Sequence, residues 1–186
     1  MVSILSLWLP ILLSAVAVFV ASSIIHMVLG YHNSDFQKVP DEDAARAAFR
    51  ALNIPPGDYV VPRAGSSAEM KDPVFVEKMK TGPNVVMTVL PPWSGSMGAQ
   101  LSQWFLFSVI VAIFTAYVVG RVFGAGAPYL SVFRIAGAVT FVSYALGAWP
   151  ASIWYRRSTN ATVKATFDAF IYAMLTGGIF GWLWPE

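Results

Sequence analysis

Apolar residues run in four long stretches along the chain, and polar residues gather in one block between the first two. The stretches cover about residues 4–29, 101–122, 129–154 and 162–184. A helix that crosses a bilayer needs about 20 mostly apolar residues, at 1.5 Å of rise per residue. Each stretch is long enough, so the pattern predicts four transmembrane helices. The first is too long for a signal-peptide core and follows no Lys or Arg, so we expect it to be retained.

Aromatic residues support this arrangement because Trp and Tyr prefer the two membrane interfaces. Four spans put both termini on one side of the membrane and the polar block on the other. The expected terminal side holds Trp8, Tyr129, Trp182 and Trp184, and the opposite side holds Trp104, Trp149, Trp154 and Tyr155. No Trp falls in the middle of a span.

The polar block, residues 30–100, has its own helix and strand signals. Acidic residues open an Ala- and Arg-rich helix that ends near Leu52, and a second short helix is predicted over 72–80. The β-rich runs 58–62 and 84–90 predict two strands. A block of this size buries little core alone, so we expect it to rest on the helix ends or on a partner.

The predicted fold class is therefore an all-α integral membrane protein. It is a four-transmembrane-helix bundle with a small α+β extramembrane insert between helices 1 and 2. The predicted organisation is helix 1 over 1–29, the insert over 30–100 and helices 2–4 over 101–186.

Composition agrees with a membrane protein. Hydrophobic residues make up 56% of the chain, charged residues 12%, and mean hydropathy is +0.60. Soluble domains carry about 25% charged residues, so a soluble globule and a disordered chain are both excluded. The insert holds 15 of the 22 charged residues. The chain has no Cys, which excludes disulfide scaffolds and thiolate sites, and its net charge of +2 is too small to indicate a nucleic-acid partner.

Positive charges between spans favour one orientation. Arg156, Arg157 and Lys164 lie on the insert side, and Arg121 and Arg134 lie toward the other. The positive-inside rule then favours a cytoplasmic insert, and without a cleavable signal we expect a multi-pass protein of the plasma (inner) membrane. Arg156 and Arg157 can also bind anionic lipid headgroups, although a topology-setting charge cluster explains them equally well.

Small residues recur every fourth position in two spans, which lets neighbouring helices approach closely. We expect close helix contacts at Ser108, Ala112, Ala116 and Gly120 in the second span and at Ala165, Ala169, Ala173, Gly177 and Gly181 in the fourth.

Two charges fall inside predicted spans, where charged residues are costly and mark candidate functional positions. Arg134 lies about 8 Å below the terminal side and Asp168 about 9 Å below the insert side. In a core about 30 Å thick, these depths place them in two separate sites. Arg134 can extend toward the terminal surface.

Asp168 has nearer polar neighbours. Lys164 lies one helical turn before it, and His26 ends the first span on the same side. We expect Asp168 to be buried between helices and held by Lys164 or His26, with Gln103 and Tyr172 nearby. Such a cluster can be a structural polar contact between helix ends, or a proton-handling, quinone or metal site.

A metal site receives little support from the sequence. His26 and His32 point about 240° apart on an ideal helix, so both reach one ion only if the helix ends between them. Stable transition-metal sites usually need three or four ligands. We therefore expect no metal at His26, His32 and Asp35, and no cofactor is indicated.

The chain contains no nucleotide-binding, metalloprotease or serine-hydrolase motif, so an enzyme is the least favoured class. We expect a non-catalytic integral membrane subunit or scaffold, packed in a larger membrane protein complex with other subunits or with itself. The alternative is a small oligomeric transporter or proton-linked channel using Asp168, Lys164 and His26.

Overall fold

The structure, a computed structural model, describes residues 1–93 and 95–186. They form two compact units, one of residues 1–37 and 97–186 and one of residues 38–96. Residues 30–37, which the sequence pattern groups with the insert, thus belong to the helical unit.

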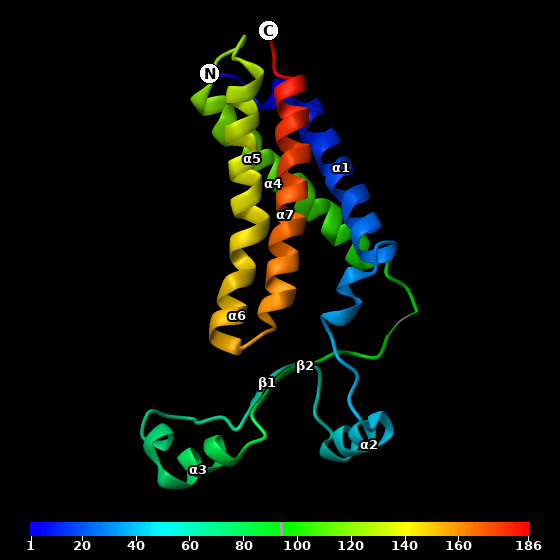
Figure 1. Ribbon diagram of the computed structural model, residues 1–186, viewed down its shortest axis with the longest axis vertical. Helices are drawn as coiled ribbons and strands as arrows, with labels where there is room; N and C mark the ends of the chain where they lie inside the picture. The colour runs from blue at the N-terminus through cyan, green and yellow to red at the C-terminus, as the bar shows by residue number, and fades with distance from the viewer. Residues whose placement is uncertain (94) are drawn as a thin grey trace. The chain divides into compact units, whose positions relative to one another are not determined.

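The helical unit contains four helical segments that are long and apolar enough to cross a membrane (Figure 1). They are Ile4–Met27, Gly98–Val122, Tyr129–Tyr155 and Thr159–Trp182. The predicted bundle of four apolar helices is thereby confirmed. The α-helices are α1 (Trp8–Met27), α4 (Gly98–Val122), α5 (Tyr129–Ala145), α6 (Trp149–Tyr155) and α7 (Thr159–Trp182). The unit's 3-10 helices are η1 (Ile4–Leu7), η2 (Tyr31–Ser34) and η4 (Leu146–Ala148).

The helices pack as a closed ring in which α7 lies against α5 and α1, and α4 lies against the same two helices. Both termini lie at the same end of the helical unit (Figure 1). An apolar cluster of buried side chains lies near that end. Its buried members are Leu7, Ile11, Ala112, Ala116, Val119, Val132, Ala136, Phe180 and Trp184. Farther along, Thr115 and Thr140 join α4 to α5 through their hydroxyls at 3.2 Å. A second, smaller cluster of Val18, Ile25 and Tyr172 lies toward the other end.

Most of the small residues for which we predict helix contacts are buried, and one of their neighbours is the N-terminal segment rather than a long helix. Seven of the nine are buried, and Ala165 and Gly181 are half-buried. A Cβ added at Gly177 would lie 2.8 Å from the Phe133 carbonyl oxygen of α5. At Gly120 a Cβ would lie 2.7 Å from the carbonyl oxygen of Val2, in the N-terminal segment. These glycines are required by close backbone approach.

The third predicted span is not one continuous α-helix. α5 ends at Ala145, η4 intervenes, and α6 begins at Trp149. Pro150 explains the break, because its ring clashes with the carbonyl four residues earlier, that of Leu146, and it donates no hydrogen bond. The fourth helix begins at Thr159, with Ser158 as its N-cap.

The second unit contains the predicted pair of helices and pair of strands. Its elements are α2 (Glu42–Leu52), β1 (Gly57–Val61), η3 (Glu69–Lys71), α3 (Pro73–Thr81) and β2 (Val85–Val89). The two strands pair antiparallel, with Tyr59 opposite Met87. Asp41 and Asp72 cap the two α-helices by accepting hydrogen bonds from backbone N–H groups.

Candidate functional site: a polar cleft at the end of α1

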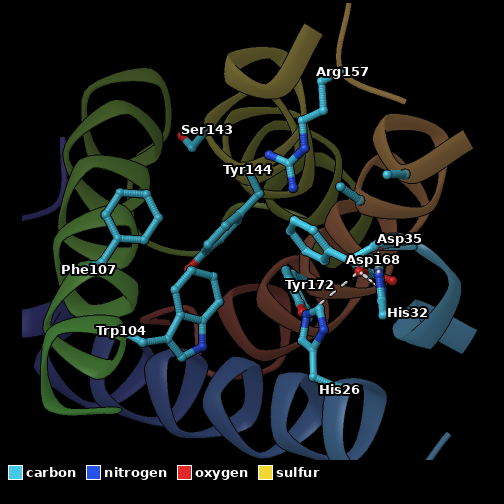
Figure 2. A pocket seen from close by; sticks show the side chains of 13 residues that line it. His26, His32, Asp35, Trp104, Phe107, Ser143, Tyr144, Arg157, Asp168 and Tyr172 are labelled. Atoms are coloured by element: carbon cyan, nitrogen blue, oxygen red, sulfur yellow. Dashed lines mark hydrogen bonds and ion pairs between the residues drawn. The ribbon is translucent and has the colours of Figure 1, made fainter. Parts of the chain in front are cut away.

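Asp168 lies at the charged end of a cleft within the helical unit, beside His32 and Asp35 (Figure 2). Its carboxylate sits on α7 and is only 5% exposed. A buried carboxylate is costly unless hydrogen bonds and opposite charge satisfy it. The Tyr31 hydroxyl donates to Oδ1 of Asp168, and Nε2 of His32 lies 2.8 Å from Oδ2.

The chain turns sharply to bring Tyr31 and His32 to this position. α1 ends at Met27, and Gly30 takes a left-handed backbone conformation with φ of 64°. A glycine adopts this conformation without the steric cost that a side chain adds. The 3-10 helix η2 follows at once and places Tyr31 and His32 over α7.

Lys164 lies one turn before Asp168 and fixes the same segment. Its ammonium group donates to the carbonyl oxygen of Tyr31 at 2.6 Å and to Asp35 Oδ1 at 2.8 Å. It also donates to Ser34 Oγ at 2.8 Å. Lys164 therefore ties the loop after α1 to α7 and neutralises Asp35 rather than Asp168.

His32 lies between two carboxylates. Its Nδ1 is 2.6 Å from Oδ2 of Asp35, while its Nε2 faces Asp168. Hydrogen bonds from Lys164 and His32 hold the pKa of the Asp35 carboxyl below its usual value. Burial and the hydrogen bond to Asp168 raise the pKa of the Tyr31 phenol, so Tyr31 stays a proton donor. The result is a continuous chain from Lys164 through Asp35, His32 and Asp168 to Tyr31.

His26 borders the same cleft from the last turn of α1. Its side chain is 50% exposed, and its Nε2 lies 3.9 Å from Oδ2 of Asp168, too far for a hydrogen bond. The rings of His26 and His32 face each other with centroids 4.3 Å apart. One ligand atom each from His26, His32 and Asp168 therefore lies within 4.8 Å of the other two.

Aromatic side chains form the opposite wall of the cleft, which has a volume of about 370 Å³. Tyr144 packs edge-on against Tyr172 at 5.2 Å and against Phe107 at 5.6 Å between ring centroids. The indole N–H of Trp104 donates to Ser22 Oγ at 2.8 Å, which anchors this wall to α1. Arg157 is a further lining residue (Figure 2). The cleft thus combines a charged end with an apolar, π-rich wall.

The structure brings together most of the polar residues that the sequence groups near the insert side. His26, Asp168 and Tyr172 line the cleft, and Lys164 lies at its edge through Asp35. Gln103 is exposed and is not a lining residue; its neighbour Trp104 faces the cleft instead. Asp168 is buried, and Tyr31 and His32 hold it, whereas the sequence predicts Lys164 or His26 as its partner.

The residues missed at this site lie in the loop after α1. In the sequence, His32 and Asp35 are only poorly supported candidate metal ligands, and no pattern predicts that Tyr31 is a site residue. Gly30 could have indicated the position of this loop, because a glycine just past a helix predicts a turn that can redirect the chain.

The other predicted charges lie apart from the network around Asp168. Arg134 is exposed beside an apolar groove of α5 and α7, and no ion pair joins it to Asp168 in the described part of the chain. Arg156 ends α6 in a left-handed conformation with φ of 56°. Arg157, a candidate for lipid headgroups, lines the cleft.

No family model, curated protein or solved structure matches the chain.

Proposed function

We propose that this chain is a non-catalytic integral membrane subunit whose insert, residues 38–96, docks on another protein of a larger membrane complex. The observation that carries the proposal is the insert's lack of a core: none of its described residues is buried. Its exposed large apolar side chains include Phe49, Leu52, Val74, Leu90 and Trp93.

The elements of the insert need support that the insert itself does not supply. α2 has 11 residues, and isolated helices shorter than about 12–15 residues are marginal in water. The sheet has two strands, and an isolated hairpin is also marginal. The caps at Asp41 and Asp72 are well formed, so the missing contribution is burial of apolar surface. A protein partner supplies that burial.

Charge favours a protein over an anionic bilayer as the partner. The insert unit holds seven Lys and Arg and seven Asp and Glu, so its net charge is zero. Recruitment to anionic lipid depends on clusters of basic residues. A neutral unit with exposed Phe and Trp side chains is instead typical of a protein interface.

The spans also leave room for neighbours. In the most apolar window of each span, only 22–39% of the residues are buried within the chain. Lipid or other transmembrane helices cover the remaining surface.

Mild-detergent purification tests the proposal. A chain with a small affinity tag at its native level should co-purify with a foreign membrane protein at a fixed molar ratio, and the particle mass should exceed that of any homo-oligomer. A chain that purifies alone or only with copies of itself would contradict the proposal. An untagged strain and a tagged unrelated four-span protein serve as controls.

A second candidate is a small oligomeric transporter or proton-linked channel, favoured by the chain of ionisable groups from Lys164 to Asp168. The side chains of the apolar cluster at the terminal end are buried, which favours a path between copies over a path through one bundle. Proteoliposomes of the pure chain test this candidate. It requires a flux that Asp168→Asn abolishes and Arg134→Gln does not.

A further inference from the structure

We propose that His26, His32 and Asp168 bind one first-row divalent transition metal ion, such as Zn²⁺, at the end of α1. Two imidazoles and one carboxylate form a recurring ligand set for such ions, both in zinc sites and in non-haem iron sites. The proposal goes beyond the subunit role and does not depend on it.

The distances suit one ion between the three side chains. Metal–nitrogen and metal–oxygen bonds are about 2.0–2.2 Å long, so tetrahedral ligands lie about 3.4 Å apart. Here Oδ2 of Asp168 is 2.8 Å from His32 and 3.9 Å from His26, and the third separation does not exceed 4.8 Å. The half-exposed His26 is the ligand free to close on the ion.

The surroundings of His32 prepare it as a ligand. Metal-bound histidines usually donate their other ring N–H to a carboxylate, which fixes the tautomer and the ring orientation. Asp35 holds Nδ1 of His32 at 2.6 Å. With the proton on Nδ1, the lone pair of Nε2 faces Asp168 Oδ2, and a cation between these two acceptors makes the contact favourable.

Lys164 pairs with Asp35, so the Asp168 carboxylate is available to bind the metal. Its ammonium group pairs with Asp35 at 2.8 Å, and Asp168 is left with the neutral phenol of Tyr31 and the imidazoles. A divalent ion balances the Asp168 carboxylate, which is buried.

Three protein ligands leave at least one coordination position for water or a small molecule. The adjoining cleft of about 370 Å³ is within the size range of small-molecule sites. One continuous helix through His26 and His32 would keep the two side chains from binding the same ion. The chain does not form that helix, because α1 ends at Met27 and the chain turns at Gly30.

Metal titration of the full-length chain tests the site. The protein is purified in detergent without a polyhistidine tag, stripped with chelator and titrated with Zn²⁺ by calorimetry and with Co²⁺ by visible absorption. The expected result is one ion per chain and a Co²⁺ spectrum typical of nitrogen and oxygen ligands. Binding well below one ion per chain would overturn the proposal and leave His32 as a bridge between two carboxylates.

His26→Ala is the decisive variant, because His26 is half exposed and makes no hydrogen bond to Asp168, so its loss should leave the fold intact. Asp35→Asn should weaken Zn²⁺ binding by about 10- to 100-fold, and His26→Ala by at least as much. Arg134→Gln, which removes an unrelated charge, should leave affinity unchanged. Wild-type affinity in a folded His26→Ala protein, judged by its melting curve, would refute the assignment.

Discussion

At the scale of single residues, the buried carboxylate of Asp168 governs the arrangement around it. An ionised carboxylate in an apolar interior is destabilising by several kcal/mol without partners. Tyr31 and His32, in the loop after α1, contact this carboxylate. Lys164, which lies on α7 like Asp168, holds that loop in place. Opposite charges and donors alternate along this network, so removal of one member leaves its neighbour unpaired.

Tyr31→Phe should therefore lower the free energy of unfolding by about 1–3 kcal/mol, because it removes a hydrogen bond to a buried charge. Denaturation of the detergent-purified protein, followed by circular dichroism, measures the change. Tyr155→Phe, at an exposed tyrosine of α6, is the matched control and should change stability by less than about 0.5 kcal/mol. Equal effects of the two variants would show that Tyr31 does not stabilise Asp168.

Asp168 and Arg134 should behave as independent sites. In a double-mutant cycle of Asp168→Asn and Arg134→Gln, the coupling free energy should stay below about 0.5 kcal/mol, the usual limit for distant residues. Unfolding free energies of the four proteins give the coupling. A coupling of 1 kcal/mol or more, roughly what a direct interaction provides, would mean that the two charges interact.

At the scale of the elements, the close approach of α5 and α7 determines much of the bundle. A Cβ added at Gly177 would lie 2.8 Å from the Phe133 carbonyl oxygen, and one added at Gly181 would lie 2.7 Å from the Tyr129 ring, so the two helices approach closely at both positions. Such contacts give dense van der Waals packing, which drives helix association where lipid is as apolar as the side chains.

Gly177→Ala should destabilise the bundle by about 1–3 kcal/mol, since the new methyl group would lie 2.8 Å from a backbone oxygen. Its neighbour provides the control. At Gly178 the nearest atom is the Tyr129 hydroxyl at 3.8 Å, an ordinary contact, so Gly178→Ala should be neutral or stabilising through helix propensity. The ranking would be wrong if Gly178→Ala proved the more harmful, as judged by the melting temperatures of the two proteins.

Some elements of the fold could be predicted from the sequence, and others could not. The four long apolar helices could be predicted because their length and apolarity are properties of the sequence. The helices of the insert could be predicted because Asp41 and Asp72 are local caps. Local sequence patterns do not predict that residues 31–35 pack against α7. This packing depends on the turn at Gly30 and on contacts with residues more than a hundred positions away. The break before α6 could have been predicted from Pro150, whose effect is local.

At the scale of the molecule, the two units differ in whether they contain a buried core. The helical unit has two buried clusters and a polar network of its own. The insert has capped helices and a paired hairpin but no buried residue in its described part. This contrast is the basis for the proposal that a protein partner completes the insert.

Site-specific photo-crosslinking in native membranes tests whether a protein partner covers the insert. A photoreactive phenylalanine analogue replaces Phe49 on the exposed side of α2, and the same analogue at the exposed polar residue Lys71 is the control. We expect one strong adduct of defined mass with a different protein at position 49, and a much weaker adduct at position 71. Crosslinks only to lipid or to a second copy of the chain at position 49, or equal adducts at both positions, would contradict it.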